Sequence, residues 1–191
     1  MRTGKITRTT RETDIEVSVD LDGGAADIST GIGFFDHMLT ALSVHSGIGM
    51  TVRCKGDLEV DGHHTVEDVG ICIGMALREA LGDRKGIARY GSFFIPMDEA
   101  LAFASLDISG RPFLVYNAQL SQERCGEFDT CLGLEFFRAL AVNAGITLHI
   151  RLEYGVNAHH ELEAIFKAVA HALKAACRIE YEDTLSTKGV L

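Results

Sequence analysis

The chain has 191 residues, of which 47% are hydrophobic and 24% are charged, a balance typical of a globular protein that buries a substantial core. Its formal net charge of −9, without any run of Lys and Arg, argues against nucleic acid or an anionic membrane surface as the main partner. No stretch approaches the roughly 20 apolar residues of a membrane span, and residues 1–5 lead into a strand pattern rather than a signal peptide, so we expect a cytoplasmic protein.

The spacing of apolar residues in the first half predicts strands and helices in turn. Strand segments alternate apolar and polar residues, whereas helical segments repeat apolar residues every three or four positions and end at glycine. In chain order these elements are a strand over residues 15–21, a helix over 35–46, a strand over 50–54 and a helix from 63 to Gly82.

The second half repeats this order, which indicates an internal duplication. Residues 36–52 match residues 134–150 at a constant offset of 98. Neither half alone covers its sheet, so we expect the halves, about 1–88 and 89–191, to pack as one globular α+β domain over residues 1–191. The expected elements are strands over 101–106 and 113–118, a helix over about 130–143, a strand over 146–153 and a helix over 159–177.

The cysteines show no sign of a disulfide framework or of a Cys-x-x-Cys site. They are odd in number, and most lie in apolar runs, as reduced cytosolic thiols do. We therefore interpret all of them as residues of the core. They are Cys54, Cys72, Cys125, Cys131 and Cys177.

The pattern His-His-x-x-Glu occurs twice, beginning at His63 and again 96 residues later at His159. Residues four apart share a helix face, so the first histidine and the glutamate of each copy can bind one ion. The second histidine points about 100° away around the helix axis, which suits a different ion. Each segment is therefore expected to serve two metal ions.

The repeat adds one further ligand to each ion. At the offset of 98, His37 corresponds to Glu135, and both lie at the start of a predicted helix. A single His-His pair is often a surface feature, but two copies in register favour a metal centre. Four nitrogen and oxygen ligands leave room in an octahedral shell for substrate or water. One set is His37, His64, His159 and Glu163, and the other is Glu135, His63, His160 and Glu67.

Three histidines remain outside these two sets. His45 corresponds to Asn143 in the repeat and is a candidate for lining the site. His149 falls in a predicted strand and His171 on a predicted helix, and we expect structural roles for both.

Six short motifs spread along the whole chain carry a family resemblance. They are Phe-Phe-Asp-His-Met-Leu (34–39), Asp-Gly-His-His-Thr-Val-Glu-Asp (61–68), Met-Asp-Glu-Ala (97–100), Ser-Gly-Arg-Pro (109–112), Asn-Ala-His-His-Glu-Leu-Glu-Ala (157–164) and Ser-Thr-Lys-Gly-Val-Leu (186–191). In this order they resemble the imidazoleglycerol-phosphate dehydratase family of histidine biosynthesis.

The resemblance implies a fold of the ribosomal-protein-S5-domain-2-like type and a 24-subunit homo-oligomer with sites built between subunits. It implies two divalent metal ions per active site, Mn²⁺ above all. The implied activity is that of a hydro-lyase, which removes water from imidazole glycerol phosphate to give imidazole acetol phosphate. The family's metal positions fall on seven of the eight ligands named above, and the exception is Glu135, where many members have a histidine.

The resemblance also implies which residues meet the substrate. Glu12 and Asp98 become acid/base candidates, and His45 a candidate for positioning the departing hydroxyl. Without it, Glu12 would be interpreted as an exposed strand-edge charge and Asp98 as a turn residue. The phosphate is expected on Arg89, Arg111, Ser186, Thr187 and Lys188, since arginine binds phosphate oxygens in pairs. The remaining substrate contacts would be Glu12, His37, His45, His63, His64 and Glu67.

Two alternatives to a dehydratase stay open from the residues alone. A two-metal hydrolase of phosphate esters would use its ions to activate water. Five histidines against three carboxylates suit recognition of an imidazole better than an oxygen-rich phosphatase centre. Structural ions that pin an assembly together would be closed by their protein ligands, whereas a catalytic ion keeps an open position.

Overall fold

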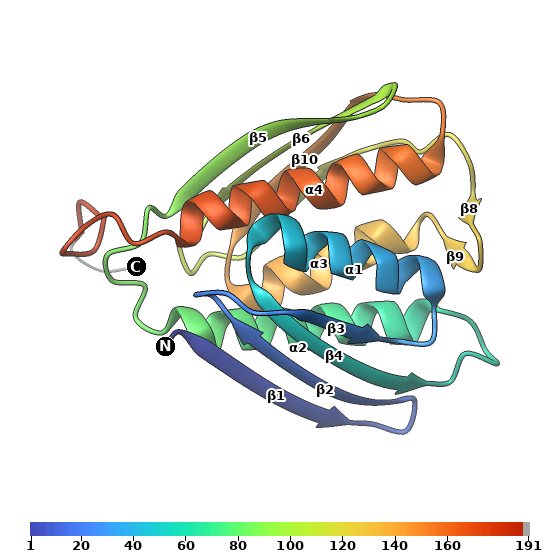
Figure 1. Ribbon diagram of the computed structural model, residues 1–191, viewed down its shortest axis with the longest axis horizontal. Coiled ribbons are helices and arrows are strands. Elements are labelled where there is room, and N and C mark those ends of the chain that lie inside the picture. Colours follow the sequence, from blue (N-terminus) through green and yellow to red (C-terminus); the bar gives the residue numbers. More distant parts are fainter. Residues whose placement is uncertain (189–191) are drawn as a thin grey trace.

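The computed structural model describes residues 1–188 and holds four helices between two four-stranded sheets (Figure 1). The last three residues of the 186–191 motif lie outside the described residues. The first half consists of β1 (Thr3–Thr9), β2 (Thr13–Asp20), β3 (Ala26–Ser29), α1 (Gly33–Ser46), β4 (Gly49–Gly56) and α2 (His63–Leu81). The second consists of β5 (Tyr90–Met97), β6 (Ala100–Asp107), β7 (Phe113–Asn117), β8 (Arg124–Cys125), β9 (Phe128–Asp129), α3 (Leu132–Ala144), β10 (Thr147–Tyr154) and α4 (Ala158–Cys177).

The two sheets have the same topology. Their strand orders are β1-β2-β4-β3 and β5-β6-β10-β7. In each sheet the first two pairings are antiparallel and the last is parallel. This correspondence confirms the prediction of a duplicated α+β fold with helices against sheets. Within the described residues, the small β8–β9 hairpin has no counterpart in the first half.

Alternation along the strands explains why helices cover one face of each sheet. Ile15, Val17 and Val19 of β2 point inward and are buried, whereas the polar residues between them face outward. Aromatic side chains fill the space between the layers, and full burial of one stabilises the fold by about 1.5–3 kcal/mol. The largest of them are Phe35, Phe128, Phe136, Phe137 and Phe166.

Glycines let a helix approach each sheet closely at equivalent places. A Cβ on Gly4 of β1 would lie 2.0 Å from the carbonyl oxygen of Ala76 in α2. A Cβ on Gly91 of β5 would lie 2.0 Å from the carbonyl oxygen of Ala172 in α4. Because both oxygens belong to a helix backbone, they cannot yield as a flexible side chain does. These glycines therefore set the spacing between helix and sheet in both halves.

All four helices begin at the same end of the molecule (Figure 1). Strand β4 carries the chain back from the end of α1 to the start of α2, and β10 does the same between α3 and α4. The helix starts share their end with the β8–β9 hairpin. The N-terminus and the segment that follows α4 lie at the opposite end.

Two strands of the four-stranded sheets escape the sequence pattern, as do the two-residue strands β8 and β9. Strand β3 has four residues, too few for its alternation to stand out. In β5, Gly91 and Pro96 interrupt an alternation that Phe93 and Phe94 also blur, since both are exposed. The other predicted strands and the four predicted helices are present, with ends shifted by a few residues.

The interpretation of the cysteines as core residues is wrong for Cys131, which is exposed at the start of α3. Cys72, Cys125 and Cys177 are buried and Cys54 is half-buried, and all five are free thiols. Burial raises the pKa of Cys177 to about 12, which keeps it protonated at neutral pH. Among residues 1–188, no helix combines the length and the apolar character needed to cross a membrane.

Replacing Gly91 by alanine tests the close packing of α4 on the second sheet. We expect Gly91→Ala to lower the free energy of unfolding by about 1–3 kcal/mol, because the new methyl group meets the Ala172 carbonyl. Chemical denaturation followed by circular dichroism measures the change. Gly33→Ala is the matched control, since a Cβ there meets nothing within 4 Å. Equal effects of the two substitutions would contradict this account.

Candidate metal centre

The shared end of the helices carries every candidate metal ligand. Each ligand lies within the first two turns of its helix, where side chains are held by a rigid backbone yet reach solvent. They are His37 in α1, His63, His64 and Glu67 in α2, Glu135 in α3, and His159, His160 and Glu163 in α4.

Equivalent hydrogen bonds start the two helices that carry the His-His pairs. The N–H of His63 donates to Asp61 Oδ1 at 2.7 Å, and the N–H of His159 donates to Asn157 Oδ1 at 3.0 Å. Such a bond satisfies one of the N–H groups that a helix start leaves without an intrahelical partner. It anchors the backbone of His63 and of His159, each within the first two residues of its helix.

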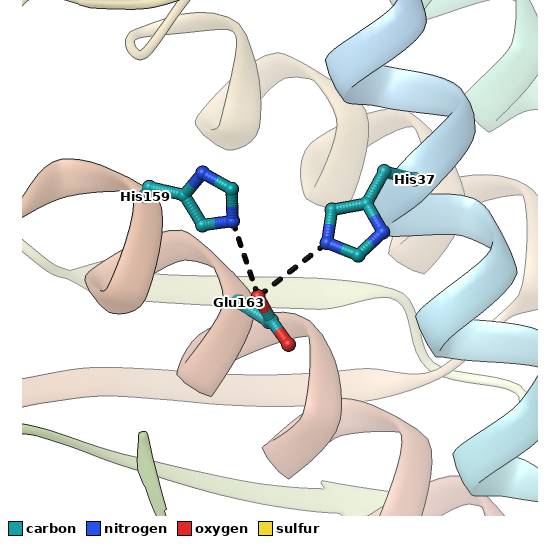
Figure 2. Close-up of side chains that lie close together, drawn as sticks. All are labelled: His37, His159 and Glu163. Atoms are coloured by element: carbon teal, nitrogen blue, oxygen red, sulfur yellow. Dashed lines mark ion pairs between the residues drawn. The ribbon is translucent and has the colours of Figure 1, made fainter. Parts of the chain in front are cut away.

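His37, His159 and Glu163 form a cluster between α1 and α4 (Figure 2). Nε2 of His37 lies 3.5 Å and Nε2 of His159 lies 3.3 Å from Oε2 of Glu163, and both rings point toward that carboxylate. One ligand atom from each residue lies within 4.8 Å of the others. These separations suit an ion whose bonds to nitrogen and oxygen are about 2.0–2.2 Å long. The structure thus brings together three ligands of the first predicted set.

Glu163 is the buried member of this cluster, and it also binds Lys167. Nζ of Lys167 lies 2.6 Å from Oε1, on the other side of the carboxylate from the imidazoles. Burial by itself would raise the pKa of Glu163, but Lys167 and His37 hold that pKa below its usual value. The carboxylate is therefore ionised and ready to bind a cation. The sequence analysis missed Lys167, although its place one helical turn after Glu163 is a usable signal.

The second predicted set is less complete within one chain. Nε2 of His63 lies 3.8 Å from Oε2 of Glu67, and both side chains are nearly half exposed. Glu135 lies on α3, which packs along α2, and its Oε2 is 2.5 Å from Nη1 of Arg138. Oε2 of Glu135 is thus taken up by an ion pair on its own helix, and within residues 1–188 this carboxylate does not form a cluster with His63 and Glu67.

The second histidine of each pair, His64 or His160, contacts a carboxylate from a loop and not the other residues of its predicted ligand set. Nδ1 of His64 lies 3.0 Å from Oδ2 of Asp57, and Nδ1 of His160 lies 2.7 Å from Oε2 of Glu99. These hydrogen bonds raise the pKa of both histidines above the ordinary value. The three-residue cluster that the described chain forms does not include His64. Within the described chain, the first set therefore lacks His64, and the second is represented only by the contact between His63 and Glu67.

The acid/base candidates lie on hairpin turns beside these two histidines. Oε1 of Glu12, in the β1–β2 turn, is 3.8 Å from Nε2 of His64, and Oδ2 of Asp98, in the β5–β6 turn, is 3.6 Å from Nε2 of His160. The sheet topology makes the two turns equivalent, so the carboxylates occupy matching places in the two halves. Asp98 adopts a left-handed φ of 47°, as tight hairpin turns often require.

His45 lies in the last turn of α1, farther along the contact with α4. Its ring centroid is 5.5 Å from that of His171, which lies 5.5 Å from Phe93. Burial, followed by the nearby charges of Lys167 and His171, lowers the pKa of His45 and favours its neutral form. His171 thus has packing partners, whereas His149 is exposed on the outer face of β10.

The predicted phosphate residues gather at the opposite end of the molecule. Arg89 donates to both carboxylate oxygens of Asp107, at 2.7 and 3.1 Å, and to the carbonyl of Leu185 at 2.6 Å. Asp107 raises the pKa of Arg89, which stays charged. A hollow of about 710 Å³ is lined by Arg89, Tyr90, Arg111, Thr184, Leu185, Ser186, Thr187 and Lys188.

This hollow is far from the cluster of Figure 2. The N–H of Arg89 donates to the carbonyl of Ala176 at the end of α4, whereas His159 stands at its start. The helix between them rises about 1.5 Å per residue, which separates the two places by about 25 Å. One small molecule cannot touch both within a single chain.

Comparisons with known proteins agree on one family. The family profile described as Imidazoleglycerol-phosphate dehydratase matches residues 30–173. Relatives of that name from Clostridium kluyveri and Cereibacter sphaeroides are 58% and 57% identical, each over 100% of both chains. A crystal structure of that enzyme from Staphylococcus aureus subsp. aureus N315 has a TM-score of 0.85 at 46% identity, covering 93% of this chain and 99% of its own. One from Pyrococcus furiosus has a TM-score of 0.82 at 41% identity, covering 97% and 100%.

Removing His37 tests whether the cluster of Figure 2 holds an ion. We expect His37→Ala to bind one divalent ion fewer per chain than the unaltered protein, because the substitution removes one of the three ligands that a single chain brings together. Elemental analysis after removal of free metal gives the count. His149→Ala removes an exposed imidazole elsewhere and should leave the count unchanged. Full metal content in His37→Ala would rule the cluster out as a binding site.

Proposed function

The chain belongs to the imidazoleglycerol-phosphate dehydratase family, a family of hydro-lyases, and on that premise we propose that it removes water from imidazole glycerol phosphate at a centre of two divalent metal ions. The product would be imidazole acetol phosphate, an intermediate of histidine biosynthesis. The observation that carries the proposal is the convergence of His37, His159 and Glu163 at the start of two helices. Family membership also argues against the phosphate-ester hydrolase.

The donor atoms present fit manganese or a similar divalent ion. Imidazole nitrogens and carboxylate oxygens suit such ions, and no thiol takes part in the described cluster. Ions held there would favour the deprotonated form of the substrate's imidazole ring, which supplies the electrons needed to expel hydroxide. The two proposed ligand sets remain those that the repeat predicts, including Glu135 in the second.

The chain's own carboxylates would move the protons. Glu12 and Asp98 are exposed on their hairpin turns and face the Nε2 side of His64 and His160. We assign them the acid and base roles at the reacting carbons, where a positioned carboxyl group contributes about 10²–10⁴-fold to the rate. His45, neutral because of its partial burial, would orient the departing hydroxyl.

The phosphate would be held by Arg89, Arg111 and the segment 186–188. The Arg89 guanidinium has five N–H groups and donates three of them to Asp107 and Leu185, which leaves two for a phosphate. The side chain of Arg111 is mostly exposed. Asp107 fixes the Arg89 guanidinium, which lines the hollow together with Arg111 and Lys188, and arginine can bind paired phosphate oxygens.

The distance between the two ends of the molecule supports self-association. About 25 Å of helix separates the proposed metal ligands from the proposed phosphate residues, so an active site that uses both would take them from different subunits. The missing members of each ligand set, His64 and His160, would be supplied in the same way. We therefore propose a large symmetric homo-oligomer, of 24 subunits by family resemblance. The five free thiols of each chain support a reducing, cytoplasmic location.

Activity depends on the metal if the proposal holds. Protein loaded with Mn²⁺ and given imidazole glycerol phosphate should form the ketone product, lose activity on chelation and regain it when Mn²⁺ returns. Product formation is followed by its absorbance after enolisation in alkali. Absence of turnover in Mn²⁺-loaded, correctly assembled protein would reject the proposed reaction.

Mixed particles test whether one site is built from several subunits. Arg89→Ala and His159→Ala should each be inactive alone, yet co-assembled in equal amounts they should regain about a quarter of the activity, because random mixing restores that share of sites. Co-assembly of His159→Ala with Glu163→Gln is the control, since both defects lie at the same end and cannot complement each other. Inactive Arg89→Ala and His159→Ala mixtures would show that one chain supplies both ends.

A further inference from the structure

We propose that Asp57 and Glu99 are positioning residues that direct Nε2 of His64 and of His160 toward the metal ions, an inference that rests on the function proposed above. Neither carboxylate belongs to the predicted ligand sets, and neither would bind an ion itself. Each acts through the imidazole that it touches. The two carboxylates contact His64 and His160, the histidines that lie outside the cluster of His37, His159 and Glu163 within one chain.

Asp57 contacts a single nitrogen of His64 with both of its oxygens. Nδ1 lies 3.0 Å from Oδ2 and 3.2 Å from Oδ1. An ionised carboxylate only accepts hydrogen bonds, so Nδ1 must carry the proton of the neutral ring. Nε2 then keeps its lone pair free for an ion, as in sites where a carboxylate backs a metal-binding histidine.

The backbone holds Asp57 in place independently of its side chain. Its N–H donates to the carbonyl of Glu12 at 3.0 Å, and its own carbonyl accepts from the N–H of Val60 at 2.8 Å. The preceding Gly56 lies so close to the first turn of α2 that a Cβ would collide with it. The loop is thus pressed onto the helix start, and the carboxylate is left to face His64.

The second half makes the same contact from a different loop. Oε2 of Glu99, in the β5–β6 turn, lies 2.7 Å from Nδ1 of His160. The residue equivalent to Asp57, the first after β10, is Gly155, where a Cβ would lie 2.5 Å from the side chain of Glu161. A side chain is crowded out there, and the hairpin supplies the carboxylate instead. Nδ1 of His64 and Nδ1 of His160 thus each contact a carboxylate, although the two carboxylates come from non-equivalent loops. The contact was therefore not simply copied by the duplication, which indicates that the site requires it.

Metal affinity measures the positioning role directly. Full-length protein is stripped of metal and titrated with Mn²⁺ in competition with a chelating indicator. We expect Asp57→Ala to weaken one of the two ions about 10–100-fold and to leave the other unchanged. The affinity of Asp57→Asn for that ion should lie between those of Asp57→Ala and the unaltered protein, because an amide oxygen still accepts a hydrogen bond. Glu59→Ala removes an exposed carboxylate from the same loop and should bind like the unaltered protein.

Two further measurements separate positioning from folding. Asp57→Ala should keep the unfolding midpoint of the metal-free protein, and combined with His64→Ala it should weaken binding no more than His64→Ala alone. Glu99→Gln should weaken the other ion; glutamine is used because Glu99 also accepts from the N–H of Val156. Unchanged affinity in Asp57→Ala and Glu99→Gln would overturn the positioning role and leave the proposed function standing. Failure of the unaltered protein to bind any divalent ion would overturn both.

Discussion

The common starting end of the four helices is the constraint on which the candidate site depends. Because β4 and β10 return the chain to that end, two helices of each half begin there, and α1 packs against α4 and α2 against α3 across the two halves (Figure 1). The side chains in the first turns of these helices are held by rigid backbone and still reach solvent, as the cluster of His37, His159 and Glu163 shows.

Helical spacing and the internal repeat predicted the cluster of His37, His159 and Glu163 from the sequence. The constant offset of the repeat identified His37 as a ligand, and the four-residue interval predicted that Glu163 lies beside His159. Contacts made by loops carry no such periodicity. Glu99 lies 61 positions from His160 and reaches it from a hairpin whose first strand the alternation did not indicate. The sequence pattern therefore predicts what helices present, and the structure adds what loops bring to it.

The proposed metal ligands and the proposed phosphate residues lie at opposite ends of the molecule. A sheet–helix–sheet sandwich is rigid along the helix axis, so it keeps the ligand end and the cationic hollow at a fixed separation of about 25 Å. Within one chain, neither end gathers all the residues assigned to the proposed site. In the proposed homo-oligomer, a closed symmetric arrangement would bring the ligand end of one subunit against the cationic hollow of another. The duplication supplied the ligand end, while Arg89 and the C-terminal segment belong to the second half alone.

The ion pair between Lys167 and Glu163 bears on the order in which the protein matures. A buried carboxylate without a counter-charge would cost several kcal/mol, and Lys167 supplies that charge from the same helix. Lys167 thus neutralises the buried carboxylate in a chain without metal, unlike small zinc domains that stay unfolded without their ion. On the proposed function, metal loading would be a late and reversible step that follows folding. In a growing cell, the supply of metal would then decide how much of the folded protein is active, while synthesis alone would decide how much of it exists.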